Sequence, residues 1–131
     1  MTEYADRPIP NALPGVLRHA GYQTAYLQAA PLAFMHKDRF MPRAGFERVE
    51  GEESFGQCEC RNGWGPDDRT LLVRATDLAL EMKQAGKPWF LTVLAAGTHH
   101  PYCVPRDFQS ALPSDSYERA AAFAFGRRLA C

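Results

Sequence analysis

Two short apolar runs dominate the hydrophobic pattern of the chain. Residues 22–30 read YQTAYLQAA, and their partial alternation puts Tyr22, Thr24 and Tyr26 on one side against Ala25 and Leu27 on the other. Residues 89–96 read WFLTVLAA and lie between a proline and a glycine. Short runs of this kind, rich in aromatic and β-branched residues, are typical of strands. We therefore predict a strand in each run, the second one buried.

The stretch between these runs carries the clearest helical signal. It starts at Gly65-Pro66, has Asp67 and Asp68 in its first turn and continues to Ala85. Proline at the first position and acidic residues near the positive end of the dipole both favour a helix start. One apolar stripe with helical spacing runs along it: Leu71, Leu72, Ala75, Leu78, Ala79 and Met82. We predict a helix that packs this stripe on the sheet.

Weaker signals fill the two ends of the chain. Residues 1–10 hold two prolines without periodicity and are predicted to be a tail or linker. Asn11 is the predicted cap of a helix over residues 13–20, with Pro14 in its first turn and Gly21 at its end. Near the carboxyl end, residues 114–130 (SDSYERAAAFAFGRRLA) predict a last helix interrupted by a glycine.

The region between the first strand and the long helix is harder to assign. Residues 31–46 (PLAFMHKDRFMPRAGF) predict a short helix or turn broken by Pro42 and Gly45. Residues 47–63 are polar and predict a loop. Their acidic cluster, Glu50, Glu52 and Glu53, has the ligand type of a hard-cation site, although a solvated charged loop is the commoner origin of such a cluster.

Alternating helices and strands predict an α/β fold, with a central, largely parallel sheet and helices on its faces. A length of 131 residues favours one domain. Fifteen basic and fifteen acidic residues balance, so nothing favours nucleic acid as a partner. No apolar run approaches the roughly 20 residues of a membrane-spanning helix, and the amino terminus lacks the pattern of a signal peptide. Localisation therefore stays open.

The four cysteines, Cys58, Cys60, Cys103 and Cys131, show neither C-x-x-C nor zinc-ribbon spacing. A C-x-C pair does not easily bridge to itself. On the logic of a reducing compartment, we expect mostly free thiols.

The best candidate site follows the second strand, where His99 and His100 come directly after Gly97. Ligands of open α/β sheets lie beyond the carboxyl ends of the strands. Three other interpretations stay open: polar residues that merely cap a strand end, a zinc site that uses His99, His100 and Cys103 with the C-x-C pair, and a nucleophilic Cys103. A glycine-rich phosphate loop and a G-x-S-x-G elbow are both absent.

Four blocks in order carry a resemblance: LPGVLRHAGYQTAYLQ, FMHKDRFMPRAGFERV, WGPDDRTLL and KPWFLTVLAAGTHHPYCVP. Together they resemble the middle of the sulfatase-like enzymes of the alkaline phosphatase superfamily, most closely the lipoteichoic acid synthases and other bacterial phosphoglycerol transferases. The resemblance covers about residues 9–105. It implies a partial three-layer sandwich with a largely parallel sheet, incomplete at both ends, and a partial sulfatase-like domain over residues 11–131.

The resemblance also implies site residues. The H-x-P motif of the family falls on His99 and Pro101, with His100 as its variable position, and implies that His99 contacts the anionic group of the substrate. In the segment that resembles FWNRD, Met35 stands where tryptophan is common and Lys37 replaces an arginine. Both positions are implied to bind the substrate head group. Lysine keeps the charge but loses the bidentate fork, and methionine loses the aromatic surface.

By resemblance, intact members are phosphoric or sulfuric ester hydrolases or phosphoglycerol transferases that hold a divalent cation (Mn, Mg, Ca or Zn). Their nucleophile and metal ligands precede and follow the matched region. We therefore expect an anionic ester as the substrate, no cofactor in this fragment and no turnover by the chain alone. The alternatives are a non-catalytic anion-binding or interaction module and a small zinc-binding domain.

Overall fold

The computed structural model describes residues 7, 9–58, 60–97 and 99. The elements of these residues, in chain order, are α1 (Leu13–His19), β1 (Gln23–Gln28), the 3-10 helix η2 (Phe34–His36), α2 (Lys37–Ala44), β2 (Arg48–Glu50), the 3-10 helix η3 (Glu52–Ser54), β3 (Arg61–Asn62), β4 (Gly65–Pro66), α3 (Asp68–Gln84) and β5 (Trp89–Leu94).

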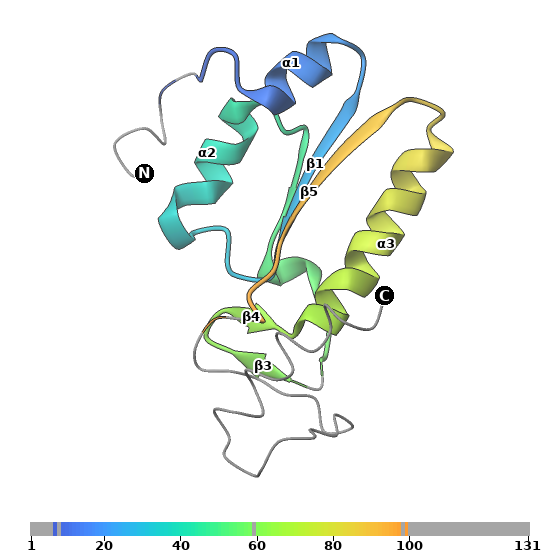
Figure 1. Cartoon of the computed structure of the whole chain (residues 1–131). Coiled ribbons are helices and arrows are strands. Elements are labelled where there is room, and N and C mark those ends of the chain that lie inside the picture. Colours follow the sequence, from blue (N-terminus) through green and yellow to red (C-terminus); the bar gives the residue numbers. More distant parts are fainter. Residues whose placement is uncertain (1–6, 8, 59, 98, 100–131) are drawn as a thin grey trace.

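The main sheet has three strands in the order β2-β1-β5, and both pairs of neighbours are parallel. Tyr26, in the central strand, pairs with Val49 on one side and with Thr92 on the other. The small antiparallel hairpin β3–β4 forms a second sheet near the carboxyl ends of these strands (Figure 1). The predicted parallel sheet is therefore confirmed.

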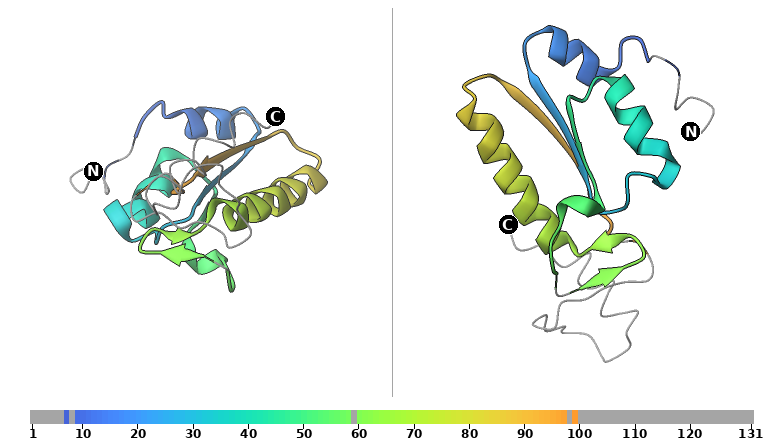
Figure 2. Two further views of the ribbon diagram at one scale, coloured as in Figure 1. Left: turned by 60° about the horizontal axis from the view of Figure 1, so that its bottom comes forward. Right: turned by 180° about the vertical axis from the view of Figure 1, so that it is seen from behind.

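Helices cover both faces of this sheet. Figure 1 and Figure 2 show α1 and α2 on one side and α3 on the other. The side chains of β1 alternate between the two layers. Ala25 and Leu27 join the apolar core under α3, whereas Tyr26 packs with Ala44 and Phe46 under α2. This alternation agrees with the predicted one, and the layers make a three-layer α/β arrangement, as expected.

The α1 helix and both long strands lie where the sequence predicts them. The burial predicted for the second strand is wrong: β5 lies at the edge of the described sheet, partly buried in its middle and exposed at both ends. The cap of α1 also differs. Its N-cap is Ala12, which makes no side-chain cap hydrogen bond, and Asn11 precedes it with a left-handed φ of 63°. Asn11 therefore serves the turn before the helix instead of capping it, since asparagine tolerates the left-handed region better than most residues. Pro14 lies in the first turn, as expected.

The predicted start of α3 was too early. Gly65 and Pro66 form β4, and the helix begins at Asp68. Asp67 is its N-cap: one carboxylate oxygen accepts a hydrogen bond from the backbone N–H of Thr70 at 3.1 Å. Pro66 pairs with Arg61 in the hairpin, and this tertiary pairing takes it out of the helix.

The predictions for residues 31–63 were partly correct: a short helix forms and Gly45 ends it, as predicted, but Pro42 does not break it, and residues 47–63 are not all loop. Pro42 lies inside α2, where it costs one backbone hydrogen bond near the end of the helix, and Gly45, with a φ of 107°, is the residue that ends it. The predicted loop contains the short strand β2. Two of its three residues are charged, so the strand has no apolar pattern that would predict it.

The cysteine prediction was correct for Cys58, which is a free thiol, and wrong for Cys60, which is disulfide-bonded. The expectation assumed a reducing compartment, and the residues themselves do not test that assumption. Of the predicted tail at residues 1–10, residues 1–6 and 8 lie outside the described residues, as do His100, Cys103 and the predicted last helix. Within the described part of the chain, no helix has the length and apolarity to cross a membrane.

Candidate functional site

A cavity of about 320 Å³ lies at the carboxyl ends of β1 and β5. Its lining comes from the last residues of β1 and β5 and the segments that follow them, from the start of α2, and from the β3–β4 hairpin. The lining residues are Gln28, Ala30, Phe34, Lys37, Trp64, Leu94, Ala95, Ala96 and His99. Because β1 and β5 are parallel neighbours, their carboxyl ends meet at one edge of the sheet, which is the usual place for a ligand in this fold class.

Lys37 is the cation of this cavity. Its side chain is buried, with 7% of the residue exposed, and its Nζ donates a hydrogen bond to Gln28 Oε1 at 2.9 Å. Among the described residues, no carboxylate forms an ion pair with Lys37. Burial lowers the pKa of its ammonium group from the usual 10.5, because a buried charge loses its hydration. The cavity therefore contains a desolvated positive group that faces only a neutral amide oxygen.

The local fold gains little from this charge. Lys37 is the first residue of α2, where a cation meets the positive end of the helix dipole. The two preceding residues, Met35 and His36, have left-handed φ values of 58° and 53°. Such conformations cost on the order of 1–3 kcal/mol each in non-glycine residues and concentrate at functional sites. A turn with two left-handed residues thus places the buried ammonium group of Lys37 at the cavity.

Gln28 fixes the polar floor of the cavity. It is fully buried, and its Oε1 accepts hydrogen bonds from Lys37 and from the Tyr26 hydroxyl, both at 2.9 Å. Its Nε2 donates to the carbonyl oxygens of Ala30 and Pro31 at 3.0 Å. Burial raises the pKa of Tyr26 to about 12, so its hydroxyl stays a donor at any ordinary pH. Every polar atom of the Gln28 amide therefore has a partner, and its orientation is set.

His99 lies on an exposed turn that α3 holds in place. The backbone N–H of Gly97 donates to Asp68 Oδ1 at 2.9 Å, and the N–H of His99 donates to the carbonyl oxygen of Ala96 at 2.9 Å. A Cβ on residue 97 would lie 2.3 Å from the Asp68 carboxylate, so a larger residue there would displace this carboxylate from the Gly97 N–H. The residues of the first turn of α3 thereby position the histidine that the sequence singled out.

Trp64, which sequence reasoning treated only as part of a helix-start motif, is a lining residue. Its indole ring lies against the His99 ring, with centroids 3.9 Å apart, and makes an edge contact with Phe34, with centroids 5.1 Å apart. The hairpin that carries it packs closely on β1. Gly65 has a φ of 103°, and a Cβ there would lie 2.0 Å from the Ala29 carbonyl oxygen.

The cavity brings together two of the three predicted substrate-binding residues, Lys37 and His99. Met35 is 39% exposed and is not among its lining residues, so its role stays a prediction. The proposed zinc ligands His100 and Cys103 lie outside the described residues. Within the described part, no group of three or more His, Cys, Asp or Glu side chains could hold a metal ion. These residues therefore do not provide a metal site.

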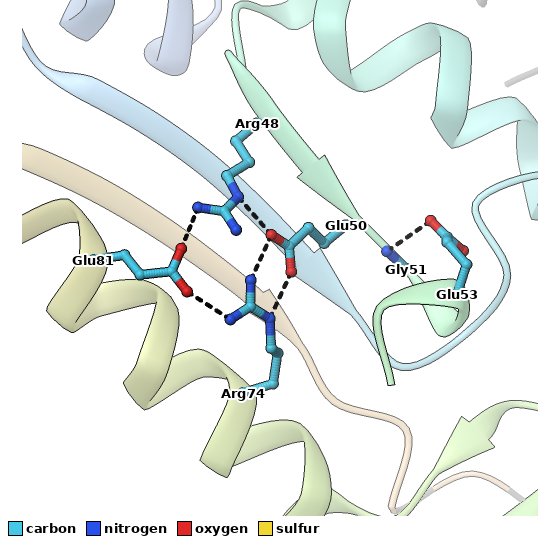
Figure 3. Close-up of polar contacts among 6 residues, drawn as sticks. All are labelled: Arg48, Glu50, Gly51, Glu53, Arg74 and Glu81. Atoms are coloured by element: carbon cyan, nitrogen blue, oxygen red, sulfur yellow. Dashed lines mark hydrogen bonds and ion pairs between the residues drawn. The ribbon is translucent and has the colours of Figure 1, made fainter. Parts of the chain in front are cut away.

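The predicted acidic cluster is separated in space. The Glu50 carboxylate is buried under α3 and accepts two hydrogen bonds from Arg74, at 2.8 Å each, and one from Arg48 Nε at 2.5 Å (Figure 3). Glu81 closes the ring of charges through both arginines. Glu52 pairs with Arg61 instead, and Glu53 accepts from the Gly51 N–H. Each of the three carboxylates thus has its own partners, and they do not form a common cation site.

The sequence matches the sulfatase family over residues 5–122. This chain belongs to the sulfatase family. It is 34% identical over 90 residues to phosphoglycerol transferase I of Escherichia coli and of Shigella boydii. These matches cover 66% of this chain and 12% of each relative. The chain therefore spans only a small part of the length of these sulfatase-family relatives.

Solved structures agree with the family assignment. The lipoteichoic acid synthase LtaP from Listeria monocytogenes superposes with a TM-score of 0.81 at 26% identity, over 94% of this chain and 32% of that one. A protein of the alkaline phosphatase superfamily from Vibrio parahaemolyticus has the same fold, with a TM-score of 0.73 at 21% identity over 88% of this chain and 30% of that one. The predicted superfamily and fold class are confirmed. The sulfatase family generally acts on anionic phosphate or sulfate esters and generally depends on a metal.

Proposed function

We propose that the cavity binds the anionic group of a phosphate or sulfate ester, with Lys37 and His99 as its contacts. The observation that carries this proposal is the buried ammonium of Lys37 without a carboxylate partner among the described residues. A bound anion would neutralise this desolvated cation, and the charge-assisted hydrogen bond between them would be strong because water is excluded. The imidazole of His99 supplies a further N–H donor at the same cavity.

Family membership supports the ester class. One relative is a phosphoglycerol transferase, and a protein of similar structure is a lipoteichoic acid synthase. For the whole family domain, we propose metal-dependent hydrolysis of such an ester or transfer of a phosphoglycerol group. For the 131 residues by themselves, we propose binding without turnover. In support, the resemblance puts the nucleophile and the metal ligands of the family outside the four matched blocks.

Titration with inorganic phosphate and with sulfate tests the binding step. We expect Lys37→Met to weaken phosphate binding about tenfold or more, because a charge-assisted hydrogen bond is lost. Lys83→Met is the matched control, since Lys83 is an exposed lysine on α3 away from the cavity. Binding should also weaken as the pH rises through the lowered pKa of Lys37, below 10.5. Equal phosphate affinities for the Lys37 variant and the wild type would overturn the proposal.

Turnover has its own test. The purified chain is incubated with p-nitrophenyl phosphate or p-nitrophenyl sulfate in the presence of Mn²⁺ or Ca²⁺. We expect no release of p-nitrophenol above that of a Lys37→Met sample. Metal-dependent release that is lost in the variant would show that the chain alone carries a complete catalytic site.

A further inference from the structure

The cavity is lined by two chemically different groups of residues. Lys37, Gln28 and His99 supply its polar groups. The remaining lining is apolar and comprises Ala30, Phe34, Trp64, Leu94, Ala95 and Ala96. An isolated phosphate or sulfate uses only the polar groups. The apolar lining can therefore contact the organic group of an ester.

The volume also exceeds what an isolated anion needs. Small-molecule sites in proteins have volumes of about 300–1,000 Å³. At about 320 Å³, this cavity reaches the lower end of that range, so an anion and a compact organic group fit together. A polyol such as glycerol gains little from an apolar wall, because its hydroxyl groups lose water there without finding partners.

Trp64 has the largest side chain of the apolar lining, and its contacts fix its position. The edge contact with Phe34 and the contact with His99 hold the indole from two elements outside its own hairpin. The hairpin is fixed by the pairing of Arg61 with Pro66 and by the close approach of Gly65 to the end of β1. A rigid aromatic surface of this kind favours flat, apolar ring faces.

We propose that the organic group of the bound ester carries a ring with an apolar face, an aryl or a sugar ring, and that Trp64 is the residue that selects for it. This inference rests on the proposed anion site. The resemblance places a tryptophan at the position of Met35, which does not line this cavity. In this chain, the aromatic lining comes from Trp64 of the hairpin and from Phe34, the residue before Met35.

Competition among phosphate monoesters tests the inference. Phenyl phosphate and glucose 1-phosphate carry an aryl and a sugar ring, and glycerol 1-phosphate carries none. We expect at least one of the two ring esters to bind the wild-type chain about fivefold more tightly than glycerol 1-phosphate, the gain expected of one ring contact. The tighter of the two identifies the kind of ring. Trp64→Leu should remove the preference, measured as the ratio of ring-ester affinity to glycerol 1-phosphate affinity in the same variant, so that any change in anion binding through His99 affects both esters alike.

Two variants serve as controls. Trp64→Phe keeps an aromatic surface and should retain part of the preference. It therefore tests the role of the ring even if the leucine variant does not fold. Trp89→Leu removes the other tryptophan, which is 42% exposed at the opposite end of β5, and should leave the preference unchanged. Circular dichroism verifies that each variant is folded.

The outcomes separate the two proposals. If wild-type chain binds inorganic phosphate through Lys37 but shows no preference between ring esters and glycerol 1-phosphate, the inference about the ring is overturned and the anion site stands. A preference that persists in Trp64→Leu overturns the role of Trp64. If inorganic phosphate does not bind, the proposed function fails.

Discussion

Lys37 and Arg74 are both cations packed against the sheet, but they lie on opposite faces and have opposite surroundings. Arg74 donates two hydrogen bonds to the buried Glu50 carboxylate and one to Glu81. Lys37 donates to one neutral amide oxygen. The hydrogen bonds that Glu50 accepts from Arg74 raise the pKa of Arg74, whereas burial lowers the pKa of Lys37.

This difference separates a structural charge from a charge that awaits a ligand. A buried ion pair with complete hydrogen bonds costs a great deal to break, although it adds little compared with an apolar replacement. A buried cation without a counterion costs stability in the folded protein and is retained only where something else benefits from it. The three predictions below test the comparison, and they run from the largest expected effect to the smallest.

Arg74→Met should destabilise the chain by about 3 kcal/mol, because it leaves the Glu50 carboxylate buried with Arg48 as its only remaining partner in Figure 3. Urea unfolding measures the change in the free energy of unfolding. Lys83→Met, on the exposed side of the same helix, should change it by less than about 0.5 kcal/mol. A similar effect for both variants would mean that the ring of charges contributes no more than an ordinary surface.

Acid should reveal the same cluster. Burial by itself would raise the pKa of Glu50, but the hydrogen bonds and charges of Arg74 and Arg48 outweigh it and hold the pKa below the usual 4.5. The unfolded chain therefore takes up this proton first. The stability from Glu50 is present above pH 4.5 and is lost as the pH falls through the lowered value. Urea unfolding measured from about pH 6 to about pH 3, a range that brackets this titration, should show the loss of stability. In Arg74→Met, the free energy of unfolding should depend less on pH over the same range.

Lys37→Met should have the smallest effect on stability and the opposite sign. Removing a buried charge that has no counterion should stabilise the folded chain by up to about 1 kcal/mol, since methionine has a similar length. Gln28 Oε1 keeps the hydroxyl of Tyr26 as a donor. Thermal or urea unfolding without added anion measures the change. A loss of more than about 1 kcal/mol would show that Lys37 is structural and would remove the contrast with Arg74.

The sequence predicts those parts of the fold whose local pattern and tertiary role agree. Residues 22–30 contain β1, the central strand, and residues 89–96 contain β5, which pairs with it and packs Leu91 and Val93 against the core, so their apolar pattern identifies both strands. The strand β2 escapes prediction because its burial rests on Glu50, an acidic residue paired with two arginines from other positions. Pro66 signals a helix start, yet its pairing with Arg61 outweighs that local preference.

The site shows the same division. His99 is predictable because it follows a clear strand, and Lys37 is predictable only through the resemblance, since a lysine in a polar stretch normally lies in water. Trp64 could have been identified by its position in a two-residue turn near the carboxyl edge of the sheet. Nothing local in the sequence, however, indicates that its ring meets Phe34 and His99.

Gly65 has a consequence for how the chain tolerates variation. It contributes no side chain, yet any Cβ at this position would overlap the carbonyl oxygen that ends β1, and its φ of 103° strains other residues as well. In a library of all single substitutions, position 65 should therefore be depleted as strongly as the fully buried Leu27. Substitutions at position 65 should be depleted more strongly in a selection for ligand binding than in a selection for folding. A displaced hairpin would move Trp64 away from the cavity while the sheet itself still folds.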